Sequence, residues 1–64
     1  MKTTYEQYAD YVYDIVTHEC EGMDSIYGDY IERIVGEYGL EALRYFKLIE
    51  SCGVINDRQL YVLV

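Results

Sequence analysis

The most reactive side chains of this 64-residue sequence are His18, Cys20 and Cys52. An imidazole that takes the proton of a nearby thiol makes a nucleophile. Nothing in the spacing brings His18 and Cys52 together, and the sequence has neither a serine nucleophile motif nor a glycine-rich phosphate loop after a strand. We therefore do not expect an enzyme, and we predict no catalytic residue.

A metal site is the second kind of chemistry to consider. Four neighbouring side chains have ligand atoms: His18, Cys20, Glu21 and Asp24. Their spacing matches no known metal-binding pattern, and a solvated helix end explains them better, so we predict no metal and no cofactor. Cys20 and Cys52 lack CxxC spacing and are expected to be two free, partly buried thiols, with a disulfide as the alternative.

Carboxylates are the main chemical signal of the chain. Twelve Asp and Glu residues against five Lys and Arg residues give a formal net charge of -7. A field of this sign repels nucleic acid and anionic membranes, and it attracts basic partners. We predict no direct binding of nucleic acid or membrane, and a partner with the basic surface of a nucleic-acid-binding protein. Solubility alone is the alternative explanation.

A helix over Thr4–Glu21 would position many of these charges. Six residues share its apolar face at i, i+3, i+4 spacing: Tyr5, Tyr8, Ala9, Val12, Ile15 and Val16. The opposite face carries Glu6, Asp10, Asp14 and Glu21. Like charges four residues apart destabilise a helix, and no lysine lies between Thr3 and Gly22 to offset them. This row of acids therefore indicates a binding face.

Local signals define the ends of this first helix. Thr3 and Glu6 have the spacing of a capping box, in which each side chain accepts a hydrogen bond from the other residue's backbone amide. Gly22 can adopt the left-handed conformation that ends a helix.

Tyrosine is the other compositional signal, with nine tyrosines against one phenylalanine and no tryptophan. Tyr5, Tyr8, Tyr27, Tyr30 and Tyr38 fall on stripes predicted to face the core. Tyr11 and Tyr13 border the acidic face, where rigid amphipathic rings make good contact residues. The predicted partner-binding residues are therefore Glu6, Asp10, Tyr11, Tyr13, Asp14, Glu21, Asp29 and Glu32.

The rest of the chain predicts two more helices and a hairpin. The second helix begins near Asp24 or at Asp29 and ends at Tyr38, before a tight turn at Gly39; the third spans Leu40–Ser51. Val54–Ile55 and Leu60–Val64 then alternate with period 2, joined by a polar turn. The expected fold is mainly α (α+β), a single domain over 1–64 of three helices with a short C-terminal antiparallel β-hairpin.

The segment ALRYFKLIESCGVINDRQLYVLV resembles the end of winged-helix domains, where LIESCGVI leads into the wing and RQLYVL returns. Such families commonly read DNA with the helix before the wing. That helix here offers Arg44 and Lys47 beside Glu41 and Glu50. This departure from the family pattern disfavours DNA and leaves a protein partner.

Three functions fit these observations. The first is a small acidic inhibitor that imitates a phosphate backbone and blocks a nucleic-acid-handling bacterial protein. In size and charge the chain is similar to phage-encoded anti-CRISPR proteins, which implies stoichiometric binding without catalysis. The second is a winged-helix-like regulatory or adaptor module, with a homodimer through the C-terminal strand as one form. The third is an accessory subunit of a larger assembly.

The apolar runs of the sequence predict where the protein is located and which segment is covered. MKTTYEQY lacks the apolar region of a signal peptide, and the longest apolar run, Leu60–Val64, is too short to span a bilayer. We therefore expect a cytoplasmic protein, in the bacterial host if phage-encoded. Leu60–Val64 is apolar on both faces and is expected to be covered by the helices and by a second copy or a partner.

Overall fold

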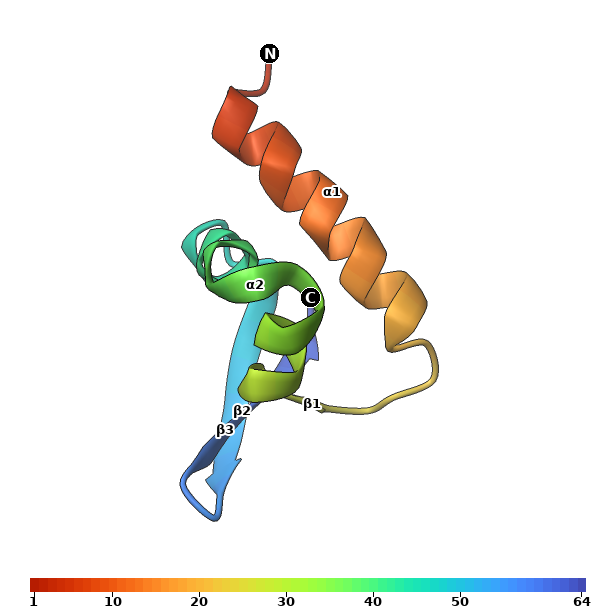
Figure 1. Ribbon diagram of the computed structural model, residues 1–64, viewed down its shortest axis with the longest axis vertical. Helices are drawn as coiled ribbons and strands as arrows, with labels where there is room; N and C mark the ends of the chain where they lie inside the picture. The colour runs from red at the N-terminus through yellow and green to blue at the C-terminus, as the bar shows by residue number, and fades with distance from the viewer.

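The computed structural model describes residues 1–64 as two helices and a three-stranded antiparallel sheet (Figure 1). The elements in chain order are α1 (Thr4–Glu19), β1 (Ile26–Tyr27), α2 (Gly28–Tyr45), β2 (Ile49–Ile55) and β3 (Arg58–Leu63). The predicted fold class, three helices with a short C-terminal hairpin, is therefore wrong. No helix is long and apolar enough to cross a lipid bilayer.

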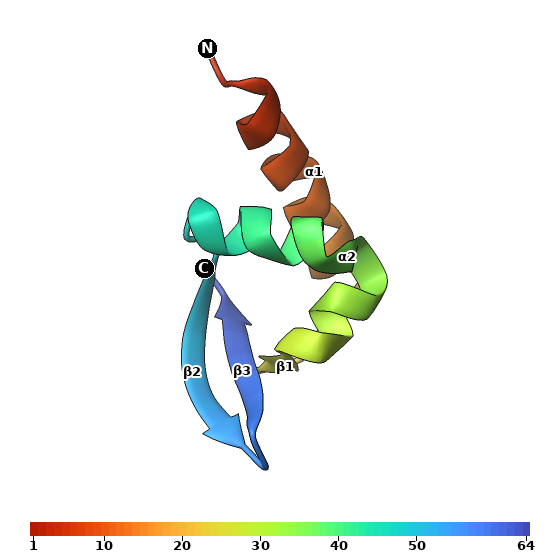
Figure 2. The same cartoon turned by 60° about the vertical axis from the view of Figure 1, so that its left-hand side comes forward.

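The predicted second and third helices are one element, α2, which bends at Gly36 (Figure 2). Gly36 has φ 82° and ψ 170°, a backbone conformation that is essentially restricted to glycine. The predicted break at Gly39 is wrong, because Gly39 is helical and buried. A Cβ atom at Gly39 would lie 2.7 Å from the Val35 side chain and 3.3 Å from that of Val12, so this glycine is needed for close packing.

The C-terminal hairpin is longer than predicted, because α2 ends at Tyr45 and β2 begins at Ile49. Lys47, between them, has a positive φ of 57°. A right-handed helix needs a negative φ, so the helix cannot extend through this residue. Asn56 and Asp57 form the two-residue turn between β2 and β3, with φ 52° and 63°. Positive φ at both central residues is the mark of a type I′ hairpin turn.

The two-residue strand β1 was not predicted, and it changes the role of the C-terminal run. Ile26 pairs with Tyr61, and β2 pairs with the other edge of β3, so the order in the sheet is β1-β3-β2. The predicted edge strand is therefore the central strand, and it pairs within its own chain. The long exposed edge of the sheet belongs to β2, of which only Ile49 is buried.

The core lies where α1 and α2 meet the sheet. All five elements contribute to its eight buried side chains, and Cys20, directly after α1, is one of them. The eight are Val12, Val16, Cys20, Ile26, Ile31, Leu43, Ile49 and Tyr61. The capping box of Thr3 and Glu6 is confirmed, as is the burial of Ala9, Val12 and Val16. Three tyrosines predicted to face the core are exposed instead, by 39% for Tyr5, 36% for Tyr8 and 71% for Tyr38.

Candidate functional site

Two acidic residues of α1 have partners within the chain: Glu6 in the predicted capping box, and Asp10 in an ion pair with Lys2 that the sequence did not reveal. The carboxylate of Glu6 accepts a hydrogen bond from the Thr3 amide, and the Thr3 hydroxyl accepts one from the Glu6 amide at 3.1 Å. Lys2 folds back to form an ion pair with Asp10, and the hydrogen bond from Lys2 to this carboxylate raises the pKa of Lys2. Two of the predicted contact acids therefore already have partners within the chain.

Tyr11 and Tyr13, the two tyrosines predicted beside that face, differ in their surroundings. Tyr13 is half-buried against the core, and its hydroxyl donates a 2.6 Å hydrogen bond to the backbone carbonyl of Val64. Tyr11 is 65% exposed. Asp14 is exposed without an ion-pair partner, and Glu21 lies beyond the end of the helix. The α1 face thus keeps Tyr11 and Asp14 as its free groups.

Asp29 belongs to a complete arginine site at the start of α2. Arg58 Nε and Nη2 donate hydrogen bonds to the two carboxylate oxygens of Asp29, at 3.0 and 3.1 Å. The guanidinium carbon lies 3.8 Å from the centroid of the Tyr27 ring, in cation–π geometry. The hydrogen bond from Arg58 lowers the pKa of Asp29. This carboxylate joins β3 to α2, and each of its oxygens accepts a hydrogen bond from Arg58.

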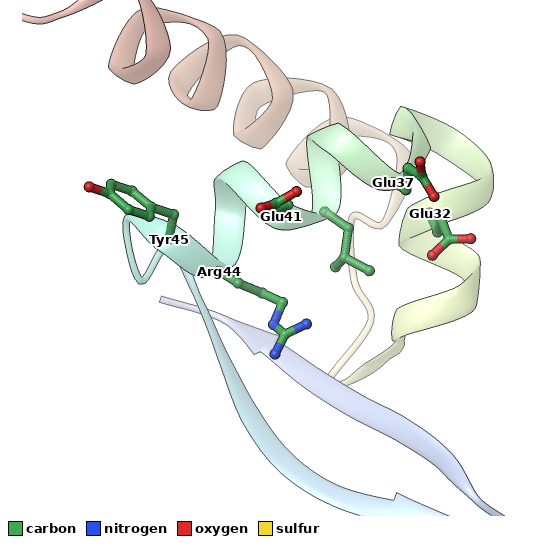
Figure 3. A pocket seen from close by; sticks show the side chains of 6 residues that line it. Glu32, Glu37, Glu41, Arg44 and Tyr45 are labelled. Atoms are coloured by element: carbon green, nitrogen blue, oxygen red, sulfur yellow. The ribbon is translucent and has the colours of Figure 1, made fainter.

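Three of the carboxylates that form no ion pair lie along the bend of α2. Six residues line an open groove of about 580 Å³ (Figure 3): Glu32, Glu37, Leu40, Glu41, Arg44 and Tyr45. We call this the α2 groove. Glu32 comes from the arm before Gly36 and the other five residues from the arm after it. None of the four charged side chains forms an ion pair, and all four are exposed.

Of the three groove carboxylates, Glu32 was a predicted contact residue, whereas Glu37 and Glu41 were not. These two acids were predicted on different helices, and the charges of the third helix were predicted to pair with one another. The signal that was available is their i, i+4 spacing, which places them on the same face once the helix is continuous through Gly39.

An aromatic cluster borders one end of the α2 groove. The rings of Tyr5, Tyr45 and Phe46 are in mutual contact, with centroids 5.4 Å apart for Tyr5 and Tyr45, 5.2 Å for Tyr5 and Phe46, and 4.9 Å for Tyr45 and Phe46. Tyr45 belongs to both the cluster and the groove. Desolvation, and after it the charge of Glu41, raises the pKa of Tyr5.

The chain contains two free thiols and no cluster of metal-binding side chains. Cys20 is buried and Cys52 exposed, and both are free thiols. Burial raises the pKa of Cys20, which makes its thiol a poor nucleophile. No three His, Cys, Asp or Glu side chains lie close enough together to hold a metal ion.

Comparisons with known proteins give no relative: no family model, no curated protein and no solved structure matches this chain.

Proposed function

We propose that this protein is an acidic protein-binding inhibitor that occupies the basic surface of a nucleic-acid-handling protein in the cytoplasm. The observation that carries the proposal is the α2 groove, where Glu32, Glu37 and Glu41 line one open surface without any ion pair. Such carboxylates attract cationic side chains, and their field speeds the encounter with a basic partner. The similarity in size and charge to anti-CRISPR proteins stays a prediction.

The charge of the α2 groove argues against DNA as the ligand. In the winged-helix resemblance, the DNA-reading helix is the one before the wing, which corresponds to the arm of α2 after Gly36. This arm exposes Glu37 and Glu41 with one groove arginine, Arg44. Phosphate binding needs clustered lysine or arginine side chains, so the surface is suited to a cationic protein.

A second candidate is a winged-helix-like adaptor that binds a protein without displacing nucleic acid. It is supported by the order of the elements, a helix, a strand, a bent helix and two strands, together with the sheet order β1-β3-β2. Both candidates use the same groove. They differ in whether the bound partner still holds its nucleic acid.

Displacement of DNA from a basic protein tests the first proposal. Protamine would be bound to fluorescein-labelled duplex DNA at low salt, and release of the DNA on addition of this protein would be followed by anisotropy. We expect release by the unmodified chain, because its carboxylates compete with phosphate for the same arginines. The effect should weaken steeply as salt rises, since it depends on exposed charges.

The location of the charges is tested with two triple variants of equal net charge. Glu32→Gln, Glu37→Gln and Glu41→Gln together should raise the concentration needed for release at least tenfold. The matched control, Asp14→Asn, Glu21→Gln and Glu50→Gln, also removes three exposed and unpaired carboxylates and should have a much smaller effect. Equal losses in both variants would show non-specific attraction by net charge. Binding of the chain to DNA in a mobility shift would contradict the proposal outright.

A further inference from the structure

The molecule contains one filled site for an arginine side chain, made of Tyr27, Asp29 and Arg58. The carboxylate of Asp29 takes two hydrogen bonds from the guanidinium, while the Tyr27 ring covers its face at 3.8 Å. Two kinds of group thus bind one cation: a carboxylate in the plane of the guanidinium and an aromatic ring against its face.

The same two kinds of group occur again at the end of the α2 groove, without an arginine stacked on the ring. Glu41 and Tyr45 are four residues apart on one helix, so their side chains leave the same face of α2. Tyr45 is 69% exposed although its ring contacts Tyr5, and Glu41 forms no ion pair. In Figure 3 the Arg44 side chain points away from the Tyr45 ring, so this neighbouring arginine does not cover it.

The geometry points to a guanidinium-binding site formed by Glu41, Tyr45 and Tyr5, which receives an arginine side chain from a protein partner. The inference rests on the proposed function, in which a basic protein segment binds the α2 groove, and it names the side chain that the groove selects. Glu41 would accept hydrogen bonds from the guanidinium edge, and the exposed ring of Tyr45 would stack on its face. Tyr5 contacts the Tyr45 ring, with the two centroids 5.4 Å apart, and would help to hold it in place.

Arginine is favoured over lysine for two physical reasons. The guanidinium is planar, so it can stack on a ring and form two parallel hydrogen bonds to a carboxylate simultaneously. An ammonium is a strongly hydrated point charge, and it gains less from an exposed ring. Glu32 and Glu37 would attract further basic residues of the same partner segment. Neither of these carboxylates is paired with an aromatic ring that a guanidinium could stack on.

Two labelled peptides of equal charge test this inference. Fluorescein-GSRGSRGS and fluorescein-GSKGSKGS would be titrated with the full chain at low salt, and Kd measured by anisotropy. We expect the arginine peptide to bind roughly two- to fivefold more tightly, the range that corresponds to an exposed cation–π contact. Tyr45→Leu should remove the preference, whereas Tyr45→Phe, which keeps the ring, should retain it. Tyr11→Leu, an exposed tyrosine away from the groove, is the matched control.

A second measurement locates the contact. Aromatic proton spectra with each peptide should show upfield shifts of the Tyr45 ring signals for the arginine peptide, which a purely structural role of this ring would not produce. Equal affinity for both peptides, or a preference that survives Tyr45→Leu, would overturn the inference. The proposed function would still stand if the Glu32, Glu37 and Glu41 variant lost both peptides. If neither peptide bound, or if this variant bound them as tightly as the unmodified chain, the inference and the proposed function would fail together.

Discussion

Two acidic surfaces of this protein look alike in the sequence and differ in the structure. On α1, Glu6 belongs to the capping box and Asp10 is paired with Lys2. In the α2 groove, Glu37 and Glu41 have no such partner. The comparison shows that the number of carboxylates on a face does not identify a binding site. What matters is whether each carboxylate already has a hydrogen-bond or ion-pair partner within the chain.

The largest expected effect comes from the bend that creates the α2 groove. Gly36→Ala should destabilise the fold by about 1–3 kcal/mol, because φ 82° with ψ 170° is strained for any residue with a Cβ atom. Open space surrounds this position, so the loss would reflect backbone strain and no steric clash. Chemical denaturation measures the change, and Arg33→Ala, at an exposed helical position, is the control.

The same variant also tests whether the bend at Gly36 positions the carboxylates of the α2 groove. Moving Glu32 relative to Glu37 should weaken binding of the arginine peptide, while the α1 face stays as it is. A Gly36→Ala protein with unchanged stability and unchanged peptide affinity would show that the bend does not define the groove.

A smaller effect is expected from the tyrosine that anchors α1. Tyr13→Phe removes the hydroxyl that donates to the Val64 carbonyl, and a hydrogen bond of this kind contributes about 0.5–1.5 kcal/mol. Tyr11→Phe should change stability by less, because no hydrogen bond of its hydroxyl is present in the structure. Thermal melts of the two variants compare an anchoring ring with a free one. Equal melting temperatures would show that the Tyr13 hydroxyl contributes no more to stability than the Tyr11 hydroxyl.

The smallest effect concerns pH and the filled arginine site. Arg58 lowers the pKa of Asp29 in the folded state, so the unfolded chain binds the proton more readily. The pair therefore stabilises the fold at pH values above the unfolded pKa of about 3.9, and this contribution is lost as the pH falls through the lower, folded pKa. Melting temperatures of the unmodified chain and of Asp29→Asn should differ at pH 7 and converge in acid. A pH-independent gap for Asp29→Asn would argue against the linkage.

The parts of the fold that local signals specify were predicted from the sequence. Thr3 and Glu6 define the start of α1, and the spacing of Val12 and Val16 gives its buried face. These predictions hold because each depends on residues within a turn or two of the same helix. The binding residues on α1 were harder to judge, since Lys2 reaches Asp10 only through a fold-back of the chain end.

The features of the fold that were predicted wrongly depend on contacts between residues far apart in the sequence. Gly36 and Gly39 are both plausible helix breaks, and the choice between them follows from the packing of Gly39 against Val12 of α1. β1 has only two residues, so it has no measurable periodicity, and it exists because Tyr61 pairs with Ile26. The α2 groove could not be predicted once the helix was divided at the wrong glycine.

The central position of β3 has a consequence for the order in which the chain folds. β2 and β3 are joined by a two-residue turn, and a hairpin of this kind forms in about 1–10 μs. β1 cannot join the sheet until β3 is present, and its pairing with Tyr61 must close a loop that contains all of α2. We therefore expect the hairpin to be the nucleus and β1 to be a late addition. The junction that carries Tyr27 and Asp29 would then be among the first regions to open when the native protein fluctuates.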